Sequence, residues 1–240
     1  MVFKLYIILM VYFLIGGVIT IFVNKDKDIV YRKNAWLKYF VYLVIINLLF
    51  ASVLINVIFF QYLCLLILLF GYYEIIKSIN LSINYSVGII SLLVFSCFAF
   101  MFYNFAHLSP RHLFYTLFLT TVFDAFSQLS GQLLGKRKIF PKISPNKTYA
   151  GVWGGLIVVI ITSVCIRDLL YLGVTQSILM GIGISGFALS GDLLASYCKR
   201  KFKIKDFSNF IPGHGGFLDR FDSLLATGSF IFLIVNIFKI

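Results

Sequence analysis

The stretch KYFVYLVIINLLFASVLINVIFFQYLCLLILLFGYYEII, residues 38–76, decides the class of protein, because Lys38 and Glu74 are its only charged residues. As a single helix it would be about 58 Å long at 1.5 Å per residue, whereas about 20 apolar residues cross a bilayer. We therefore expect two membrane-spanning helices, 38–55 and 57–76, with almost no connector between them.

The composition of the whole chain agrees with that interpretation. Of 240 residues, 60% are hydrophobic and only 12% are charged, and the mean hydropathy is +0.97. A soluble core of this size cannot bury so much apolar surface, which excludes a soluble enzyme, a disordered chain and a disulfide-stapled secreted domain. The net charge of +12 marks the short loops of a membrane protein and not a nucleic-acid partner.

The same length criterion predicts six further spans, at 5–23, 85–105, 113–133, 151–171, 177–195 and 221–239. The first exceeds the apolar core of a signal peptide and lacks a small-residue cleavage site, so we expect it to be retained. The fold class is thus an all-α polytopic bundle of about eight transmembrane helices. We divide it into N-terminal helices, 1–105, and a C-terminal catalytic region, 106–240.

The distribution of basic residues predicts the orientation. Seventeen of the 21 Lys and Arg residues lie in or beside the connections 24–38, 77–84, 134–150 and 196–220. The other four are Lys4, Arg111, Arg167 and Lys239. Because cytoplasmic loops are enriched in basic residues, we place the two long basic loops, 134–150 and 196–220, in the cytoplasm and both termini outside.

Three acidic residues lie inside apolar spans or at their mouths: Asp124, Asp192 and Asp222. An ionised carboxylate there costs about 3 kcal/mol or more, so each is a candidate site residue, with an internal salt bridge as the alternative. The predicted topology lets all three converge on one cytoplasm-facing cavity. We interpret Asp26, Asp28, Glu74 and Asp168, in a loop or near span ends, as unremarkable.

Around Asp124 the helix carries a polar, small-residue stripe. Helical spacing places Ser127, Gln128, Gly131 and Gly135 on the Asp124 face. Close helix packing explains the glycines, but it explains the acid and the glutamine poorly.

The loop 134–150 contains Pro141, Ser144, Pro145 and Lys147, and we expect it to be irregular. Its cations are either topology signals and contacts to anionic lipid, or part of a substrate site.

The residues of the loop 196–220 point more specifically to binding of a phosphate-bearing substrate. A cationic run that includes Lys199, Arg200 and Lys205 suits a polyphosphate, and the turn from Pro212 to Gly216 lets backbone N–H groups approach phosphate oxygens. Asp219 and Asp222, three residues apart on an opening helix, suit a hard cation such as Mg²⁺ bridging to substrate phosphates. His and Cys are too few and too scattered for a zinc site.

Residues Ser196 to Asp222 read S-x-x-K-R-x-x-x-x-K-D-x-S-x-x-I-P-G-H-G-G-F-x-D-R-F-D. This segment resembles the signature of the phosphatidate cytidylyltransferase family at every fixed position. The resemblance extends to G-D-L at 191–193, S-P-x-K-T at 144–148 and the helix that begins at Asp124. The N-terminal half is similar only in being a set of hydrophobic helices.

The resemblance implies transfer of CMP from CTP to phosphatidic acid, giving CDP-diacylglycerol and pyrophosphate. It also implies dependence on Mg²⁺, with or without a second cation, and a homodimer. By position, Asp192 and Asp219 are similar to the family's metal ligands, and Asp222, Lys199 and Lys205 complete the expected catalytic set. The expected substrate-binding residues are Lys147, Ser144, Arg200, His214, Gly215, Gly216, Arg220 and Asp124.

Two departures from the family pattern bear on the substrate. Ala150 stands where an acid is usual, and Ser127 and Gln128 stand where Ala-Tyr is frequent. They leave open a different lipid phosphate as acceptor. A CTP-dependent polyprenol kinase and a transporter are rival functions that the residues also leave open. We expect an integral protein of a bacterial inner membrane with its active site facing the cytoplasm.

Overall fold

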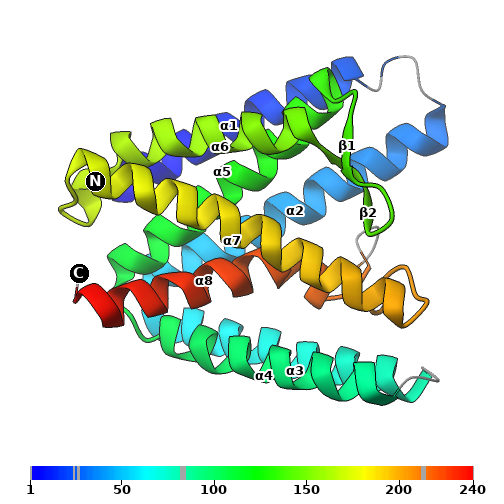
Figure 1. The fold of residues 1–240 in the computed structure, drawn as a ribbon. Coiled ribbons are helices and arrows are strands. Elements are labelled where there is room, and N and C mark those ends of the chain that lie inside the picture. Colours follow the sequence, from blue (N-terminus) through cyan, green and yellow to red (C-terminus); the bar gives the residue numbers. More distant parts are fainter. Residues whose placement is uncertain (1, 24, 26–27, 82–84, 212–214, 240) are drawn as a thin grey trace.

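The computed structural model describes residues 2–23, 25, 28–81, 85–211 and 215–239. Within that part of the chain it contains eight α-helices, one 3₁₀ turn and a two-stranded hairpin (Figure 1). In chain order these are α1 Val2–Val23, α2 Ile29–Ile55, α3 Val57–Leu81, α4 Tyr85–Phe105, α5 Pro110–Leu134, β1 Lys138–Phe140, β2 Ser144–Thr148, α6 Tyr149–Cys165, η1 Arg167–Leu169, α7 Val174–Lys201 and α8 Leu218–Phe238.

The long apolar run breaks at one residue, which confirms the predicted pair of helices. Asn56 is extended, with φ −162° and ψ 125°, and ends α2. Its side-chain Oδ1 accepts a hydrogen bond of 3.0 Å from the Ile58 amide. Asparagine is well suited to this place because its short amide caps the first turn of the next helix. One polar side chain therefore separates the two spans.

Five of the helices, α2, α3, α4, α7 and α8, are long and apolar enough to cross a membrane. Their outward faces carry large exposed hydrophobic side chains, such as Leu69 on α3 and Ile90 and Phe100 on α4. An exposed apolar surface of this extent requires lipid as its solvent. The protein is an all-α polytopic membrane protein, as predicted.

Three predicted boundaries were wrong by more than five residues. The span expected to begin at residue 38 begins at Ile29 as α2, so Arg32 and Lys33 lie on that helix and not in the loop 24–38. The span 151–171 ends as a helix at Cys165, because the chain then turns through η1 and buries Leu169 and Leu172 against the core. The loop 196–220 is shorter than expected, since α7 continues to Lys201 and α8 begins at Leu218. Lys199 and Arg200 therefore lie on the last turn of α7 and not in a loop.

The loop 134–150 is not irregular. It forms an antiparallel hairpin, with Lys138 opposite Thr148 and Phe140 opposite Ser144. The two prolines that suggested an irregular loop are compatible with this hairpin. Pro141 lies in the turn, and Pro145 lies in a strand of a two-stranded sheet, where a missing N–H is tolerated at the free edge.

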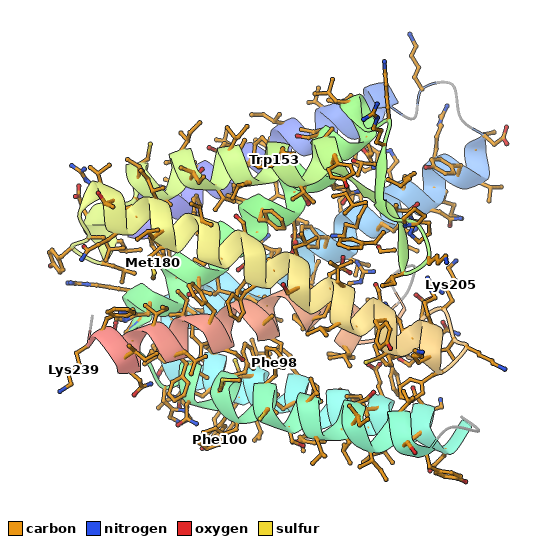
Figure 2. All side chains as sticks on the ribbon, in the orientation of Figure 1. Phe98, Phe100, Trp153, Met180, Lys205 and Lys239 are labelled. Carbon is orange, nitrogen blue, oxygen red and sulfur yellow. The ribbon has the colours of Figure 1, made fainter. Side chains whose placement is uncertain are left out.

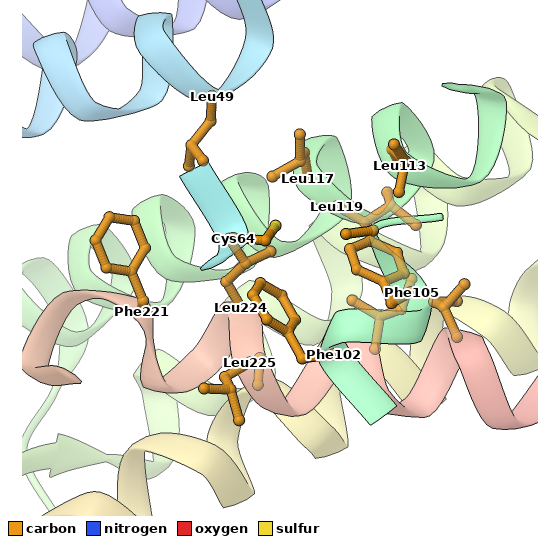
Figure 3. Close-up of a cluster of buried hydrophobic side chains, with 14 of the residues drawn as sticks. Leu49, Cys64, Phe102, Phe105, Leu113, Leu117, Leu119, Phe221, Leu224 and Leu225 are labelled. Carbon is orange, nitrogen blue, oxygen red and sulfur yellow. The ribbon is translucent and has the colours of Figure 1, made fainter. Parts of the chain in front are cut away.

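The core lies where α5 and α8 meet the N-terminal helices. Its largest buried side chains are aromatic: Phe50 packs edge-on against Phe114, and Phe60 against Phe105. Figure 3 shows Leu49, Phe102 and Leu224 in the same cluster. The predicted regions 1–105 and 106–240 thus share one core, because α2, α3 and α4 all contribute to it.

The bundle has two distinct ends. Both termini lie at one end, and the hairpin and the described residues between α7 and α8 lie together at the other (Figure 1). Figure 2 shows Lys205 at the hairpin end and Lys239 at the opposite end. The two basic loops therefore share one face, as the distribution of positive charge predicted.

Candidate active site

The first part of the site forms where α7 crosses α8. A Cβ added at Gly191 would lie 2.5 Å from the backbone carbonyl oxygen of Asp222. Real Cβ atoms do not approach that closely, so only glycine allows this crossing. The close approach brings Asp192, the next residue on α7, to the second turn of α8, where Asp222 lies.

Lys147 reaches this crossing from the hairpin. Strand β2 carries it, and Thr148 begins α6 by accepting a 3.1 Å hydrogen bond from the Gly151 amide. The Lys147 Nζ lies 2.7 Å from Asp192 Oδ2. Asp192 therefore forms an internal salt bridge, which the sequence analysis gave as the alternative to a site role. Its partner, Lys147, is itself a predicted site residue.

More than one acid stabilises the protonated form of Lys147. Burial lowers the pKa of its ammonium group, but the carboxylates of Asp192, Asp124 and Asp222 outweigh burial and leave that pKa above its usual value. Lys147 thus lies within electrostatic range of all three acids that the sequence singled out. We call Asp124, Asp192, Asp222 and Lys147 the open cluster.

The acids of the open cluster have spare hydrogen-bonding capacity. Asp222 Oδ1 accepts a 2.7 Å bond from the Ser223 amide. Its buried Oδ2 has no hydrogen-bond partner among the described residues. Asp124 lines a cavity of about 30 Å³ between α2, α5 and α8, together with Tyr42 and Arg220. A buried carboxylate oxygen without a donor is costly, and it is a natural position for a cation or a ligand donor.

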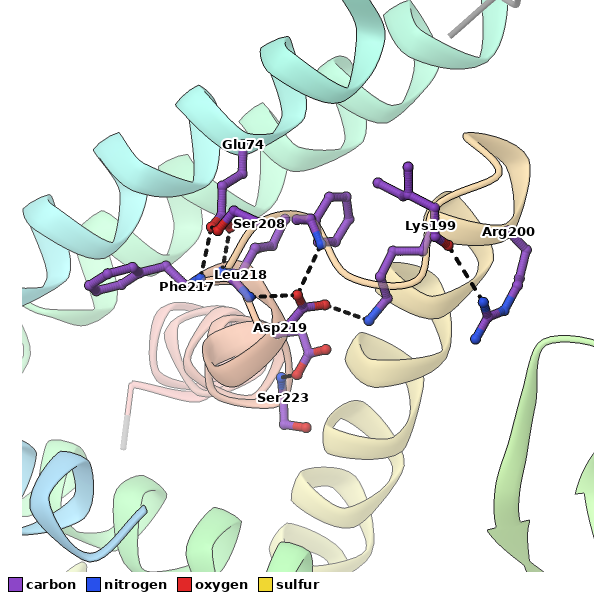
Figure 4. A network of polar contacts seen from close by, with 12 residues as sticks. Glu74, Lys199, Arg200, Ser208, Phe217, Leu218, Asp219 and Ser223 are labelled. Carbon is purple, nitrogen blue, oxygen red and sulfur yellow. Dashed lines mark hydrogen bonds and ion pairs between the residues drawn. The ribbon is translucent and has the colours of Figure 1, made fainter. Parts of the chain in front are cut away.

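Asp219 is in a different state from these acids. Its Oδ1 pairs with Lys199 Nζ at 2.5 Å, and its Oδ2 accepts bonds from the amides of Phe207 at 3.0 Å and Gly216 at 2.9 Å. The side chains are almost fully buried, 2% exposed for Asp219 and 10% for Lys199. Both oxygens of Asp219 are therefore engaged by the protein itself (Figure 4).

Glu74 joins this network, and the sequence analysis missed it. The side chain comes from α3, is fully buried, and accepts hydrogen bonds from Ser208, Phe217 and Leu218 (Figure 4). The same cost of burying a carboxylate in an apolar span that singled out Asp124 applies to Glu74. We call Glu74, Lys199 and Asp219 the closed network.

The other predicted residues are distributed around these two groups. Arg200 is exposed, and its Nε donates to the Ile143 carbonyl at 3.3 Å, which links the end of α7 to the hairpin. Gly215 has φ +85°, a conformation that favours glycine. Lys205 is exposed, and Ser144 is the first residue of β2. Gly216 precedes α8 and donates its amide to Asp219, and Arg220 follows Asp219 in α8. His214 lies outside the described residues.

An apolar cavity of about 70 Å³ adjoins the open cluster. It lies between α4, α7 and α8, and Phe95, Phe98, Leu194 and Leu225 contribute to its walls. Asp222 lines the same cavity and is its acidic group. An apolar volume that ends at a carboxylate suits an amphiphilic ligand better than a purely polar one.

The glycines of the Asp124 stripe pack closely against Thr148, the N-cap of α6, because Cβ atoms added at Gly131 and Gly135 would lie 3.1 Å and 2.6 Å from Thr148 Oγ1. This agrees with the close-packing interpretation of that stripe, and two glycines of α6 pack against α5 in turn. A Cβ added at Gly151 would lie 2.6 Å from the Ser127 carbonyl, and one at Gly155 would lie 3.0 Å from the Ser127 Cβ. Ser127 thus lies in the α5–α6 contact, while Gln128 is exposed and Ala150 is the second residue of α6. The departure at Ser127 therefore lies in the contact between two helices beside the site.

Two carboxylates of this arrangement are suited to bind a Mg²⁺ ion. Among the described residues no group of three or more His, Cys, Asp or Glu side chains is placed to hold a metal. Proteins commonly bind Mg²⁺ through one or two carboxylates, with water and substrate phosphates completing the shell. Asp222, whose Oδ2 has no hydrogen-bond partner among the described residues, and Asp192 meet that requirement. Both oxygens of Asp219 are already engaged by protein donors.

The chain belongs to the cytidylyltransferase family, whose family model matches residues 1–238. The match includes the N-terminal helices, which the signature motifs did not reach.

Three curated relatives extend this result. The chain is 35% identical over 130 residues to the phosphatidate cytidylyltransferase of Bacillus subtilis (strain 168), covering 53% of this chain and 48% of the relative. It is 37% identical over 123 residues to that of Rickettsia bellii (strain RML369-C), covering 48% and 53%. It is also 43% identical over 125 residues to the uncharacterized protein YnbB of Escherichia coli (strain K12), covering 51% and 41%. The chain spans about half the length of the curated relatives that it matches.

Proposed function

We propose that this protein transfers CMP from CTP to phosphatidic acid, giving CDP-diacylglycerol and pyrophosphate. The observation that carries the proposal is the open cluster: three acids and one lysine gathered at the basic end of a membrane bundle, beside an apolar cavity. Membership of the cytidylyltransferase family and the names of two relatives support CTP as donor and phosphatidic acid as acceptor.

In the proposed reaction, a phosphate oxygen of the lipid attacks the α-phosphorus of CTP. The new P–O bond forms as the bond from the α-phosphorus to the β-phosphate oxygen breaks, and pyrophosphate leaves with that electron pair. Such a transfer needs positioning and charge neutralisation more than a protein nucleophile. Lys147 is suited to this role because its neighbouring acids keep it protonated.

Mg²⁺ is the proposed cofactor, and when bound it supplies positive charge to the triphosphate. The residues proposed to hold it are Asp192 and Asp219, with Asp222 as a further oxygen donor. Asp192 and Asp222 are the more accessible pair, because Lys199 occupies Asp219 Oδ1. Lys199, Arg200 and Lys205 then balance the remaining phosphate charge, by contact or at longer range.

The proposed location is a bacterial inner membrane, with the basic end of the bundle in the cytoplasm. The excess of Lys and Arg at that end and the bacterial relatives support this orientation. A homodimer is proposed on the family resemblance, and cross-linking in intact membranes tests it.

The decisive assay uses CTP labelled separately on the α- and γ-phosphates. Purified protein in lipid with Mg²⁺ is supplied with phosphatidic acid in one arm and with a polyprenol in the other. We expect the α label to enter the lipid in the phosphatidic acid arm. Label from the γ position in the polyprenol would identify a kinase, and the absence of label in both lipids would contradict the proposed acceptor.

A further inference from the structure

Helix α8 begins without a cap from its own sequence. Phe217 occupies the N-cap position, and its side chain makes no capping hydrogen bond. The first amides of a helix have no partner within the helix, so buried ones need an acceptor from elsewhere. Asp219 accepts the Gly216 amide, which leaves the amides of Phe217 and Leu218 to be satisfied.

Glu74 supplies that acceptor from another helix. Its Oε1 accepts the Phe217 amide at 2.9 Å, and its Oε2 accepts the Leu218 amide at 2.8 Å. Ser208 donates its hydroxyl to the same Oε1. A carboxylate is favoured at this place because the N-terminus of a helix carries partial positive charge. The cap is therefore built between segments more than 130 residues apart.

The surrounding contacts show that α3 and the loop fit closely. Phe70 stacks on Phe217 with ring centroids 4.4 Å apart, and it also meets Phe210 edge-on at 5.7 Å. A Cβ added at Gly216 would lie 2.6 Å from Glu74 Oε1. A side chain at residue 216 would therefore displace the Glu74 carboxylate from its present position, and aromatic packing shields these hydrogen bonds from water.

We propose that Glu74 is a positioning residue, which caps α8 and holds residues 207–211 and 215–218 in the conformation that presents Asp219 and Asp222. This role rests on the proposed cytidylyltransferase function. Glu74 does not touch substrate, because it is fully buried and its oxygens accept from protein donors. It acts through Asp219, which accepts the amides of Phe207 and Gly216 in the segment that Glu74 anchors.

The test compares the wild type with Glu74→Ala, Glu74→Gln and a control, Cys64→Ala, in lipid nanodiscs. Cys64 is buried on the same helix, about 15 Å away at 1.5 Å per residue, and belongs to the core and not to the loop contact. Three quantities are measured for each protein: thermal stability, amide hydrogen exchange of peptides covering 207–219, and kcat and KM for CTP per folded molecule.

In Glu74→Ala we expect exchange in 207–219 to be about tenfold faster or more, because two amides lose their acceptor. We expect kcat to fall about 100-fold, the scale at which catalytic groups displaced by an ångström lose activity. Glu74→Gln keeps the length and one carbonyl acceptor, so both effects should be smaller. Cys64→Ala should lower stability while leaving exchange in the loop and kcat unchanged.

Two results would overturn the proposal. One is a Glu74→Ala protein with lower stability but wild-type loop exchange and wild-type kcat per folded molecule, since that describes a purely structural residue. The other is loss of kcat with wild-type loop exchange. If the wild type itself transfers no CMP to phosphatidic acid, the proposed function fails, and the exchange measurement still decides whether Glu74 holds the loop.

Discussion

The open cluster and the closed network each include residues of α7 and α8, yet the carboxylates in the two groups have opposite hydrogen-bonding states. Asp219 in the closed network receives an ammonium group and two amides, and Glu74 receives a hydroxyl and two amides. Asp222 in the open cluster keeps a buried oxygen without a partner among the described residues. A satisfied acid holds the fold in place, whereas an unsatisfied one is available to a ligand.

This contrast separates two kinds of residue that the sequence motif presents together. Asp219 and Asp222 are one helical turn apart in the same D-R-F-D segment. The motif treats them alike, but the structure assigns the first to the loop contacts and leaves the second facing the α7–α8 crossing. Substitutions in the two groups should therefore change stability and activity in different proportions.

We expect Asp192→Asn to show the largest difference between its effect on activity and its effect on stability. Asp192 is partly exposed in the open cluster, so the change should lower CMP transfer about 100-fold or more while thermal stability stays close to that of the wild type. Initial rates with α-labelled CTP, together with the unfolding midpoint in detergent, provide the measurement. A protein that retains near-normal turnover would remove Asp192 from the site.

Asp219→Asn should damage both properties. It leaves Lys199 buried without its ion-pair partner, which typically costs about 3–5 kcal/mol of stability, and we expect activity to be lost as well. Unfolding in detergent measures the first effect. The double variant Asp219→Asn with Lys199→Met should recover stability but not activity. Recovery of both would show that Asp219 is needed only for folding.

Lys147→Met should have an intermediate effect. Loss of one charge-assisted contact to phosphate is expected to lower kcat/KM for CTP about tenfold to a hundredfold. The raised pKa of Lys147 keeps it protonated below its usual value of 10.5, and its charge is lost only as pH rises beyond that. Affinity for CTP should therefore show no Lys147-dependent change between about pH 7 and pH 9, which a pH series on both proteins would reveal.

Lys205→Ala should have the smallest effect. The side chain is exposed, so its charge acts on CTP through solvent and is screened by salt. We expect a loss of about twofold to threefold in kcat/KM at low ionic strength, which vanishes at high salt. A larger, salt-independent loss would place Lys205 in direct contact with substrate.

Much of the fold followed from the sequence because lipid imposes a simple length rule. Apolar runs of about 20 residues located all eight helices, and the same length rule divided the longest run at the place where the structure has Asn56. The hairpin was missed because its strands are short and contain Pro145. The end of α6 was missed because apolar residues continue beyond Cys165 while the backbone turns.

The site was less predictable than the fold. The three acids of the open cluster could be found because an ionised carboxylate in an apolar span is energetically costly. Lys147 could be found from the S-P-x-K-T motif at 144–148. Glu74 carried the same signal, but its partners follow more than 130 residues later in the chain. A single sequence does not show which distant amides will donate hydrogen bonds to a buried carboxylate. The structure was therefore needed to assign each acid to the open cluster or to the closed network.

The most direct test of the central claim measures α-labelled CMP transfer to phosphatidic acid by the wild type and by Asp192→Asn, with both proteins shown to be folded. The structure predicts labelled lipid from the wild type and a loss of about 100-fold or more in the variant. Equal transfer by the two proteins, or transfer of the γ-phosphate instead, would contradict the placement of cytidylyl transfer at the open cluster.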